Sequence, residues 1–562
     1  MTYRQETLNR MKGKIMKYSI LSIMVMLAAT AQAGVITLDG HHLTQEQAWS
    51  IAEGKDTVAI SSEAYERLER AHQLVELAAK GGTPVYGLTV GVGLNKDKSL
   101  FSANGELSQE VREASKAFNR NALRSHSAGI GPMAEDVIAR LQLVIRLNTL
   151  LAGQTGAQPK VAELYRDFLN KGITPQIPAR GSVGEADITL SSHVGAVMMG
   201  EWKAKVDGKV VSGAEALKLK GVSPLDPQGK DALAILSTNA MAVAQVMKAR
   251  KDAKTLADFS PALFALSLEG LNGNTAPVLP QAVSVHPFTG LEKEASRIRD
   301  ALDGSYLWKK NEERALQDPL SFRTSVYVLR EVNQALNHLD EELQVQLNSS
   351  DDNPGTILNA DKKYSEHEQV AMYFVEGKDV KGAIVPTANF EPLPVAIAAQ
   401  RLGIALTHLS HNSVQRSIHL SDEHFTGLTR FLSDPKNKGH AFGAIQKPFV
   451  ALHSENQTLA NPVSFLGTPV AGDIEDTFTN LPLVAERLAK IADNTAYIYS
   501  LELLHAAQAV DLRTKLKGQF AMGKDSQELY KRYRQAVKYV GEDRIFTDDI
   551  ENGKNLIMNN LR

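Results

Sequence analysis

Apolar residues recur at every third or fourth position over long stretches of this chain. In 324–347, seven aliphatic residues keep that spacing over about six helical turns, and 133–151 show the same pattern. Other segments are apolar on more than one face, as expected of helices inside a bundle: 229–250, 394–419, 443–460 and 482–511. The pattern predicts a mainly α fold built on a long helical bundle.

Strand patterns are few by comparison. Residues 35–38 predict a short strand, and 202–211 predict a hairpin that turns at Asp207-Gly208. We therefore expect a loop-rich N-terminal region to precede the helical bundle. The chain divides into a leader (1–33), the N-terminal region (34–225), the central bundle (226–515) and a C-terminal helical tail (516–562).

The first 33 residues have the layout of a secretory signal peptide. Five basic residues in 1–19 precede an apolar run at 20–29, and Ala31-Gln32-Ala33 follows as a small-x-small cleavage site. The run is much shorter than the roughly 20 residues of a membrane span. We expect cleavage after Ala33 and a periplasmic mature chain without membrane association; an uncleaved anchor is the alternative.

Charge and composition exclude several classes of function. The formal net charge of −2 offers no basic excess for a nucleic acid. The chain has no cysteine, which excludes disulfides, thiolate metal sites and cysteine nucleophiles. His408 and His411 lie one turn apart on a predicted helix, but no His-Glu-x-x-His motif is present. We expect no metal site.

Short motifs rich in glycine and polar residues punctuate the chain at 86–93, 181–193, 317–323, 350–354, 389–392 and 454–476. Their order and spacing resemble those of the aromatic amino acid lyases, over about residues 36–515. The resemblance implies a carbon–nitrogen lyase with a long, mostly α-helical bundle. It also implies a homotetramer whose active sites are built from several subunits.

One motif departs from that family. Its members form an electrophilic methylidene-imidazolone from an Ala-Ser-Gly triad that follows Gly-Ser-Val-Gly. Here Gly181-Ser182-Val183-Gly184 is followed by Glu185-Ala186-Asp187, which offers no serine to dehydrate and no glycine nitrogen to attack. We expect this cofactor to be absent. In this respect the chain resembles the ergothionase-type members of the family.

Loss of the electrophile predicts the substrate class. The electrophile activates a primary amine, whereas a quaternary ammonium has no lone pair for it and departs as neutral trimethylamine. We therefore expect elimination of trimethylamine from a betaine of an aromatic amino acid, such as ergothioneine to thiourocanate. Two alternatives stay open: an ammonia-lyase acting on histidine or another aromatic amino acid, and an inactive relative that binds betaines.

We expect four catalytic residues, of which the resemblance supplies three, Tyr86, Arg323 and Glu475, whereas Lys447 stands where histidine lyases look apolar. Tyr86 removes the β-proton, and Arg323 binds the substrate carboxylate through its planar fork. Glu475 and Lys447 hold the thioimidazole, with Lys447 stabilising charge on sulfur. The expected substrate-binding residues, of which Glu185 and Asp187 suit a cation, are His126, Glu185, Asp187, Gln317, Asn353, Asn389 and Phe390.

Overall fold

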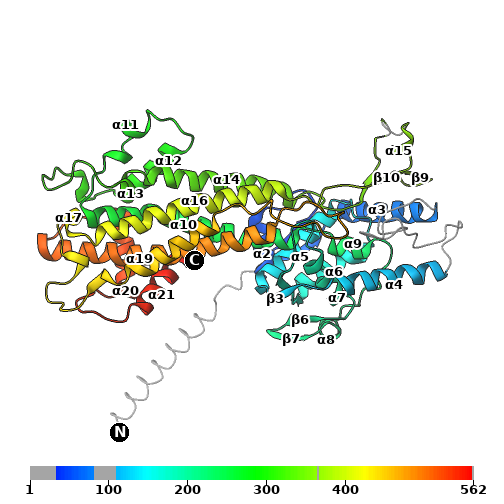
Figure 1. The fold of residues 1–562 in the computed structure, drawn as a ribbon. Coiled ribbons are helices and arrows are strands. Elements are labelled where there is room, and N and C mark those ends of the chain that lie inside the picture. Colours follow the sequence, from blue (N-terminus) through cyan, green and yellow to red (C-terminus); the bar gives the residue numbers. More distant parts are fainter. Residues whose placement is uncertain (1–32, 82–108, 362, 364–365, 560–562) are drawn as a thin grey trace, which may run out of the picture.

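The computed structural model of this chain describes residues 33–81, 109–361, 363 and 366–559. Residues 1–32 of the expected signal peptide therefore lie outside the described residues, as does Tyr86 with its glycine-rich loop. Figure 1 shows an elongated molecule, with the long helices towards one end and most of the N-terminal helices at the other.

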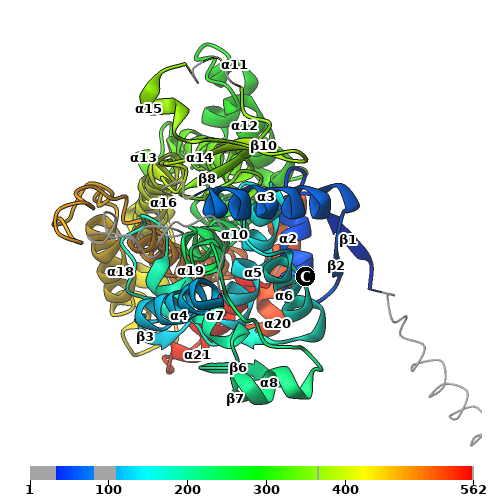
Figure 2. The same ribbon diagram turned by 90° about the vertical axis from the view of Figure 1, so that its right-hand side faces the viewer.

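Long helices that lie side by side form the bundle that the apolar periodicity predicts (Figure 1). They are α10 (Ala240–Leu271), α14 (Ser325–Leu347), α16 (Leu393–Leu420), α18 (Gln446–Leu459) and α19 (Leu481–Lys517). Helix α19 packs against α10, α16 and α18, and Figure 2 shows α10 and α19 near the centre. Residues of α10 and α19 are buried on several faces, which explains their weak amphipathicity. The expected mainly α fold is confirmed.

The single helix expected at 229–250 is wrong. Helix α9 (Asp231–Leu236) ends before Ser237, and α10 begins at Ala240 and continues to Leu271. The break arises because the polar groups of 237–239 bond to distant segments instead of continuing a helix. Among the described residues, 231–271 is the one stretch long and apolar enough to cross a membrane, and most of it is buried inside the protein.

The N-terminal region alternates helices with short strands. Its helices are α2 (Gln45–Ala52), α3 (Ser62–Lys80), α4 (Gln109–His126), α5 (Asp136–Leu151), α6 (Pro159–Lys171), α7 (Ile188–Met198) and α8 (Gly213–Leu219). Strand β1 (Val35–Leu38) pairs in parallel with β2 (Thr57–Ile60). The expected hairpin is confirmed as β6 (Lys203–Val206) and β7 (Lys209–Ser212), with left-handed backbone at Asp207 and Gly208.

Short elements complete the fold. The remaining strands are β3 (Ile130–Met133), β4 (Thr174–Pro175), β5 (Pro178–Arg180), β8 (Gly355–Leu358), β9 (Phe374–Glu376) and β10 (Lys381–Val385). The remaining α-helices are α11 (Pro280–Val283), α12 (Leu291–Ala301), α13 (Leu320–Arg323), α15 (Glu368–Ala371), α17 (Glu423–Thr426), α20 (Lys524–Ala536) and α21 (Thr547–Met558). In Figure 1, α13 and α17 lie towards the end of the bundle opposite α7 and α9.

Candidate active site

Loops that precede α7 and α19 meet at one end of the bundle. The carbonyl of Val183 accepts a hydrogen bond from the Asn480 amide at 2.8 Å, and the Gly184 carbonyl accepts one from the Thr479 hydroxyl at 3.3 Å. Gly184 has a φ of 90°, and a Cβ there would clash with Thr479 and with the Leu481 backbone. Only glycine fits this close approach, so the loop of 181–187 is held directly against the start of α19.

Asn239 joins that loop to the segment before α16. Its side-chain oxygen accepts a hydrogen bond from the Ala186 amide at 3.1 Å, and its side-chain nitrogen donates to the carbonyl of Phe390. Ala186 has a left-handed φ of 57°, which a residue with a Cβ adopts at a cost. The fully buried Asn239 amide therefore fixes a strained backbone beside Glu185.

A buried ion pair lies beneath Asn239. The guanidinium of Arg146, on α5, contacts Asp351 at 2.6 Å and Asp352 at 2.8 Å, and all three residues are almost fully buried. The other carboxylate oxygen of Asp351 accepts hydrogen bonds from the Thr238 hydroxyl at 2.6 Å and the Asn239 amide at 3.0 Å. The residues between α9 and α10 are thus the ones through which Arg146, Asp351 and Asp352 anchor Asn239.

Asp187 belongs to the structure of its loop. It is fully buried, and its carboxylate accepts hydrogen bonds from the Ser182 hydroxyl at 2.7 Å and the Ala242 amide at 2.8 Å. Burial raises its pKa to about 6. Because both oxygens have protein partners, this geometry argues against the expectation that Asp187 binds the substrate.

Glu185 has a different environment. Its Oε1 is buried and has no hydrogen-bond partner among the described residues. Burial and the negative charge of Glu391, followed by that of Glu475, raise the pKa of Glu185 to about 8, against the opposing effect of the Thr479 amide. The carboxyl groups of Glu391 and Glu475, which come from two other loops, are therefore near enough to act on Glu185.

Other expected binding residues lie on segments at this same end. The side-chain oxygen of Asn353 accepts a hydrogen bond from the Thr387 amide at 2.9 Å, which ties the 350–354 motif to the segment that carries Asn389 and Phe390. His126 ends α4, and its Nδ1 bonds to the Ala122 carbonyl at 2.8 Å. Three residues later, the Gly129 amide donates to the carbonyl of Thr189 in α7, which places His126 near the loop of 181–187.

Gln317 and Arg323 lie away from the loops around Glu185. Arg323 ends α13, and its Nε donates to the Asp318 carbonyl at 2.8 Å. The next residue, Thr324, accepts a hydrogen bond from Asn412, which lies 19 residues along α16 from Leu393, or about 28 Å at 1.5 Å per residue. One chain therefore does not bring Arg323 to the loops around Glu185 (Figure 1).

Lys447 is also distant from Glu475 within one chain. It is exposed at the start of α18, two residues before Phe449, whose ring centroid is 5.7 Å from that of His505. His505 lies 24 residues into α19, about 36 Å from the end that Glu475 precedes. A single chain therefore does not bring Lys447 and Glu475 together, because α19 separates them, and their pairing stays a prediction.

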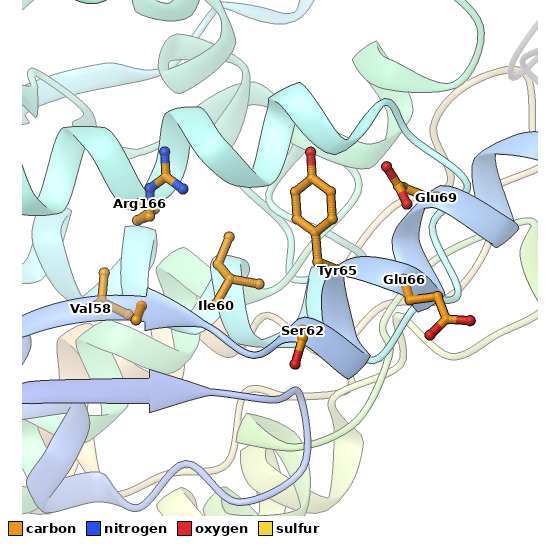
Figure 3. Close-up of a pocket in the computed structure, with 8 residues that line it drawn as sticks. Val58, Ile60, Ser62, Tyr65, Glu66, Glu69 and Arg166 are labelled. Carbon is orange, nitrogen blue, oxygen red and sulfur yellow. The ribbon is translucent and has the colours of Figure 1, made fainter.

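A depression of about 660 Å³ lies apart from these residues (Figure 3). It is lined by β2, the start of α3 and one residue of α6, Arg166. Tyr65, Glu66 and Glu69 contribute to its wall, and none of the expected site residues does. The depression is therefore separate from the expected site.

The histidines form one notable contact. Nδ1 of His411 lies 2.9 Å from Nε2 of His453, whose Nδ1 lies 3.1 Å from the Ser410 hydroxyl. Burial, together with the nearby His411 and His408, lowers the pKa of His453 to about 4. Within the described ranges, no three or more His, Asp or Glu side chains are grouped to hold a metal ion.

The helical bundle and the glycine-rich loop before α7 define a class of protein, the carbon–nitrogen lyases of the ammonia-lyase type. Residues 43–535 match the sequence profile described as "Aromatic amino acid lyase". The chain belongs to the aromatic amino acid lyase family.

Individual relatives agree with this assignment. The crystal structure of the ergothioneine-degrading enzyme ergothionase from Treponema denticola is 38% identical, with a TM-score of 0.84, over 93% of this chain and 99% of that one. Tyrosine aminomutase from Streptomyces globisporus is 28% identical, with a TM-score of 0.80, over 93% and 97%. A protein named histidine ammonia-lyase from Treponema denticola is 30% identical over 93% of this chain and 97% of its own length.

Sequence reasoning missed two residues of the site. Glu391 stands in the quoted motif Asn389-Phe390-Glu391-Pro392, yet only the asparagine and the phenylalanine were expected to bind substrate. Asn239 had a signal in the interruption of apolar periodicity at 237–239. Their proximity to Glu185 results from contacts across more than 50 residues, which local patterns do not encode.

Proposed function

We propose that this chain eliminates trimethylamine from a betaine of an aromatic amino acid, converting ergothioneine to thiourocanate, without a methylidene-imidazolone. The observation that carries the proposal is the carboxyl cluster around Glu185, which stands where the family places its electrophile. Carboxyl groups suit a permanent cation. The 38% identity to an ergothioneine-degrading enzyme supports the same substrate class.

The residues after Gly184 do not fit formation of the electrophile. A ring of this kind needs a serine that loses water and a following nitrogen with little steric protection. Glu185-Ala186-Asp187 supplies neither, and the Ala186 amide already donates to Asn239. The reaction we propose therefore uses side chains alone.

The elimination balances without an added reactant. The phenolate of Tyr86 takes the β-proton, the C–H electron pair becomes the new C=C bond, and the Cα–N bond breaks to release neutral trimethylamine. The proton then passes from Tyr86 to water. Because the ammonium is quaternary, it has no proton to lose, and the base acts only on carbon.

Arg323 reaches the substrate carboxylate in an assembly of several copies, which we propose is a homotetramer. Within one chain, Arg323 is separated from Glu185 by most of α16. Apolar side chains near Arg323 are left open to solvent, with Leu316 at 89% and Leu320 at 62% exposure. Phe465, in the segment before α19, is 75% exposed. Contacts between copies would cover these side chains.

The same assembly would bring Lys447 of one copy to Glu475 of another. Glu475 would accept a hydrogen bond from the substrate ring, and Lys447 would stabilise negative charge on sulfur as the β-proton leaves. The substrate is then held by its carboxylate, its ring and its ammonium group. The pattern of residues 1–33 supports a periplasmic location for this reaction.

The deciding experiment incubates the purified protein separately with ergothioneine, its sulfur-free counterpart hercynine, and histidine. Trimethylamine, ammonia and the unsaturated acid are quantified in each case. We expect trimethylamine from ergothioneine and no ammonia from histidine. Saturable betaine binding without turnover would instead identify an inactive binding relative.

A second candidate is an ammonia-lyase acting on histidine, which the relatives named histidine ammonia-lyase at 28–30% identity favour. That activity needs an electrophile formed by loss of water from the chain. An intact-mass spectrum at the unmodified mass, together with no ammonia from histidine, would exclude it.

A further inference from the structure

Two residues of the site have no individual role in the proposed reaction so far, Glu391 and Asn239, and one buried oxygen of Glu185 has no partner among the described residues. We propose that Glu391 is a substrate-binding residue and that Asn239 is the positioning residue whose amide holds it beside Glu185. Together, Glu185 and Glu391 form the binding site of the substrate's quaternary ammonium group, called here the ammonium site. This inference rests on the proposed function.

The hydrogen bonds of Asn239 set the distance between the two loops. Its acceptor oxygen holds the amide of Ala186, the residue after Glu185, and its donor nitrogen holds the carbonyl of Phe390, the residue before Glu391. A side-chain amide offers both functions at once, whereas a carboxylate offers only acceptors. The fully buried Asn239 is itself fixed by the bond from its backbone amide to Asp351.

The two carboxyl groups are held differently. Oε1 of Glu391 accepts a hydrogen bond from the Leu393 amide at 2.9 Å, at the N-terminus of α16, which orients that side chain. Oε1 of Glu185 is buried without a partner among the described residues. A buried carboxyl oxygen without a partner is costly, and a cation placed beside it would remove that cost.

The charges that act on Glu185 explain what happens when a cation binds. The negative charges of two other glutamates act on Glu185. They are Glu391, from the segment before α16, and Glu475, from the segment before α19. Burial and these neighbours raise the pKa of Glu185 to about 8, so Glu185 is mostly protonated at pH 7. A bound quaternary ammonium favours the ionised form and expels this proton, so affinity for the cation rises as the pH rises towards 8.

Tetramethylammonium chloride is a probe of the ammonium site that needs no turnover. Calorimetry at pH 7 in phosphate and in Tris, whose ionisation enthalpies differ, counts the protons released. We expect the wild type to release nearly one proton per site and Glu185→Gln to release none. Glu391→Gln should weaken binding of the probe about tenfold, whereas Glu486→Gln, an exposed glutamate near the start of α19, should change nothing.

Steady-state kinetics separate this role from a merely structural one. The positive charge of the substrate persists until the Cα–N bond breaks, so the ammonium site binds the substrate and the proton-removal transition state equally. Loss of such uniform binding raises KM and leaves kcat unchanged. We expect Glu391→Gln to raise KM for the betaine about tenfold with kcat within about twofold, and Asn239→Leu to do the same because it releases both loops.

Two results would overturn the inference: no proton release on binding by the wild type, or unchanged probe affinity and KM in Glu391→Gln. If Asn239→Leu does not fold, the Glu391→Gln variant still decides the binding role. A different result would overturn the proposed function alone. A wild type that binds tetramethylammonium with proton release but yields no trimethylamine keeps the ammonium site and loses the reaction.

Discussion

Two buried arginines support the two ends of the bundle. Arg146 pairs with Asp351 and Asp352 beneath the loops around Glu185. At the other end, Arg416 of α16 makes two hydrogen bonds to Glu502 of α19, at 2.6 and 2.8 Å. Both charges are almost fully removed from water, and each is compensated by carboxylates in direct contact.

The two arginines differ in what they join. Arg416 joins two long helices and donates to the Ser325 hydroxyl at 2.9 Å, beside the α13 segment that ends in Arg323. Arg146 instead joins α5 to the loop of Asp351, which in turn holds Asn239. The Arg323 end is therefore supported by helix packing, whereas the Glu185 end depends on a chain of polar contacts. Loss of a contact should therefore change KM at the second end and leave KM unchanged at the first.

The largest effect should come from removing the proposed base and the proposed carboxylate partner in different copies of the chain. Tyr86→Phe and Arg323→Met should each lower kcat/KM about 10³-fold, because one removes the base and the other the carboxylate partner. Co-expression should restore activity, since sites that draw Tyr86 from one copy and Arg323 from another are intact in roughly a quarter of random combinations.

The measurement is the activity of co-purified hybrids carrying two different affinity tags. Equal mixing of the separately folded variants, without subunit exchange, is the control and should remain inactive. Hybrids without recovered activity would show that Tyr86 and Arg323 do not reach one site from different copies.

The next largest effect should come from replacing each of the two buried arginines. Arg146→Met and Arg416→Met should each lower the free energy of unfolding by about 3–5 kcal/mol, because each leaves buried carboxylates unpaired. Urea unfolding measures this change. The folded fraction of Arg416→Met should keep its KM, whereas that of Arg146→Met should show a KM about tenfold higher, because Asn239 loses its support.

The sequence predicted the helices for a physical reason. Apolar spacing in 324–347 and 482–511 reports burial along α14 and α19, and burial is what holds these helices in place. The hairpin at Asp207-Gly208 was predictable because its turn needs left-handed backbone. The break after α9 was harder to predict. The polar run at 237–239 interrupts the apolar pattern, but it contains neither proline nor glycine, and the bonds that end the helix go to the distant Asp187 and Asp351.

The site was predictable only in part. The motif order identified the loop of Glu185 and the position of Glu475, which the fold brings together. It could not show that Arg323 and Lys447 lie tens of ångströms away along α16 and α19, because motif spacing carries no distance in space. Asp187 was assigned to the substrate because sequence cannot show that Ser182 and Ala242 occupy its oxygens.

A smaller effect tests whether Lys447 joins the site from another copy. Lys447→Met should lower kcat for ergothioneine about thirtyfold, because charge on sulfur loses its stabilising ammonium. The sulfur-free counterpart has no such charge, so its kcat should change less than threefold. Parallel kinetics with both betaines measure the ratio. Equal losses for both substrates would place Lys447 in a structural role instead.

The smallest effect comes from single hydroxyl groups at the two ends. Thr479→Val removes the hydrogen bond to the Gly184 carbonyl, and Ser325→Ala removes the one from Arg416. Each change should cost about 1 kcal/mol, seen as lower stability in one variant and as weaker substrate binding in the other. Ser325→Ala should lower the free energy of unfolding, because its partner is a buried charge between helices. Thr479→Val should instead raise KM about threefold with little change in urea midpoint, because the loop of 181–187 shifts without unfolding the bundle. Unfolding curves and kinetics on both variants measure the contrast, and an unchanged KM in Thr479→Val would contradict the distinction drawn between the two arginines.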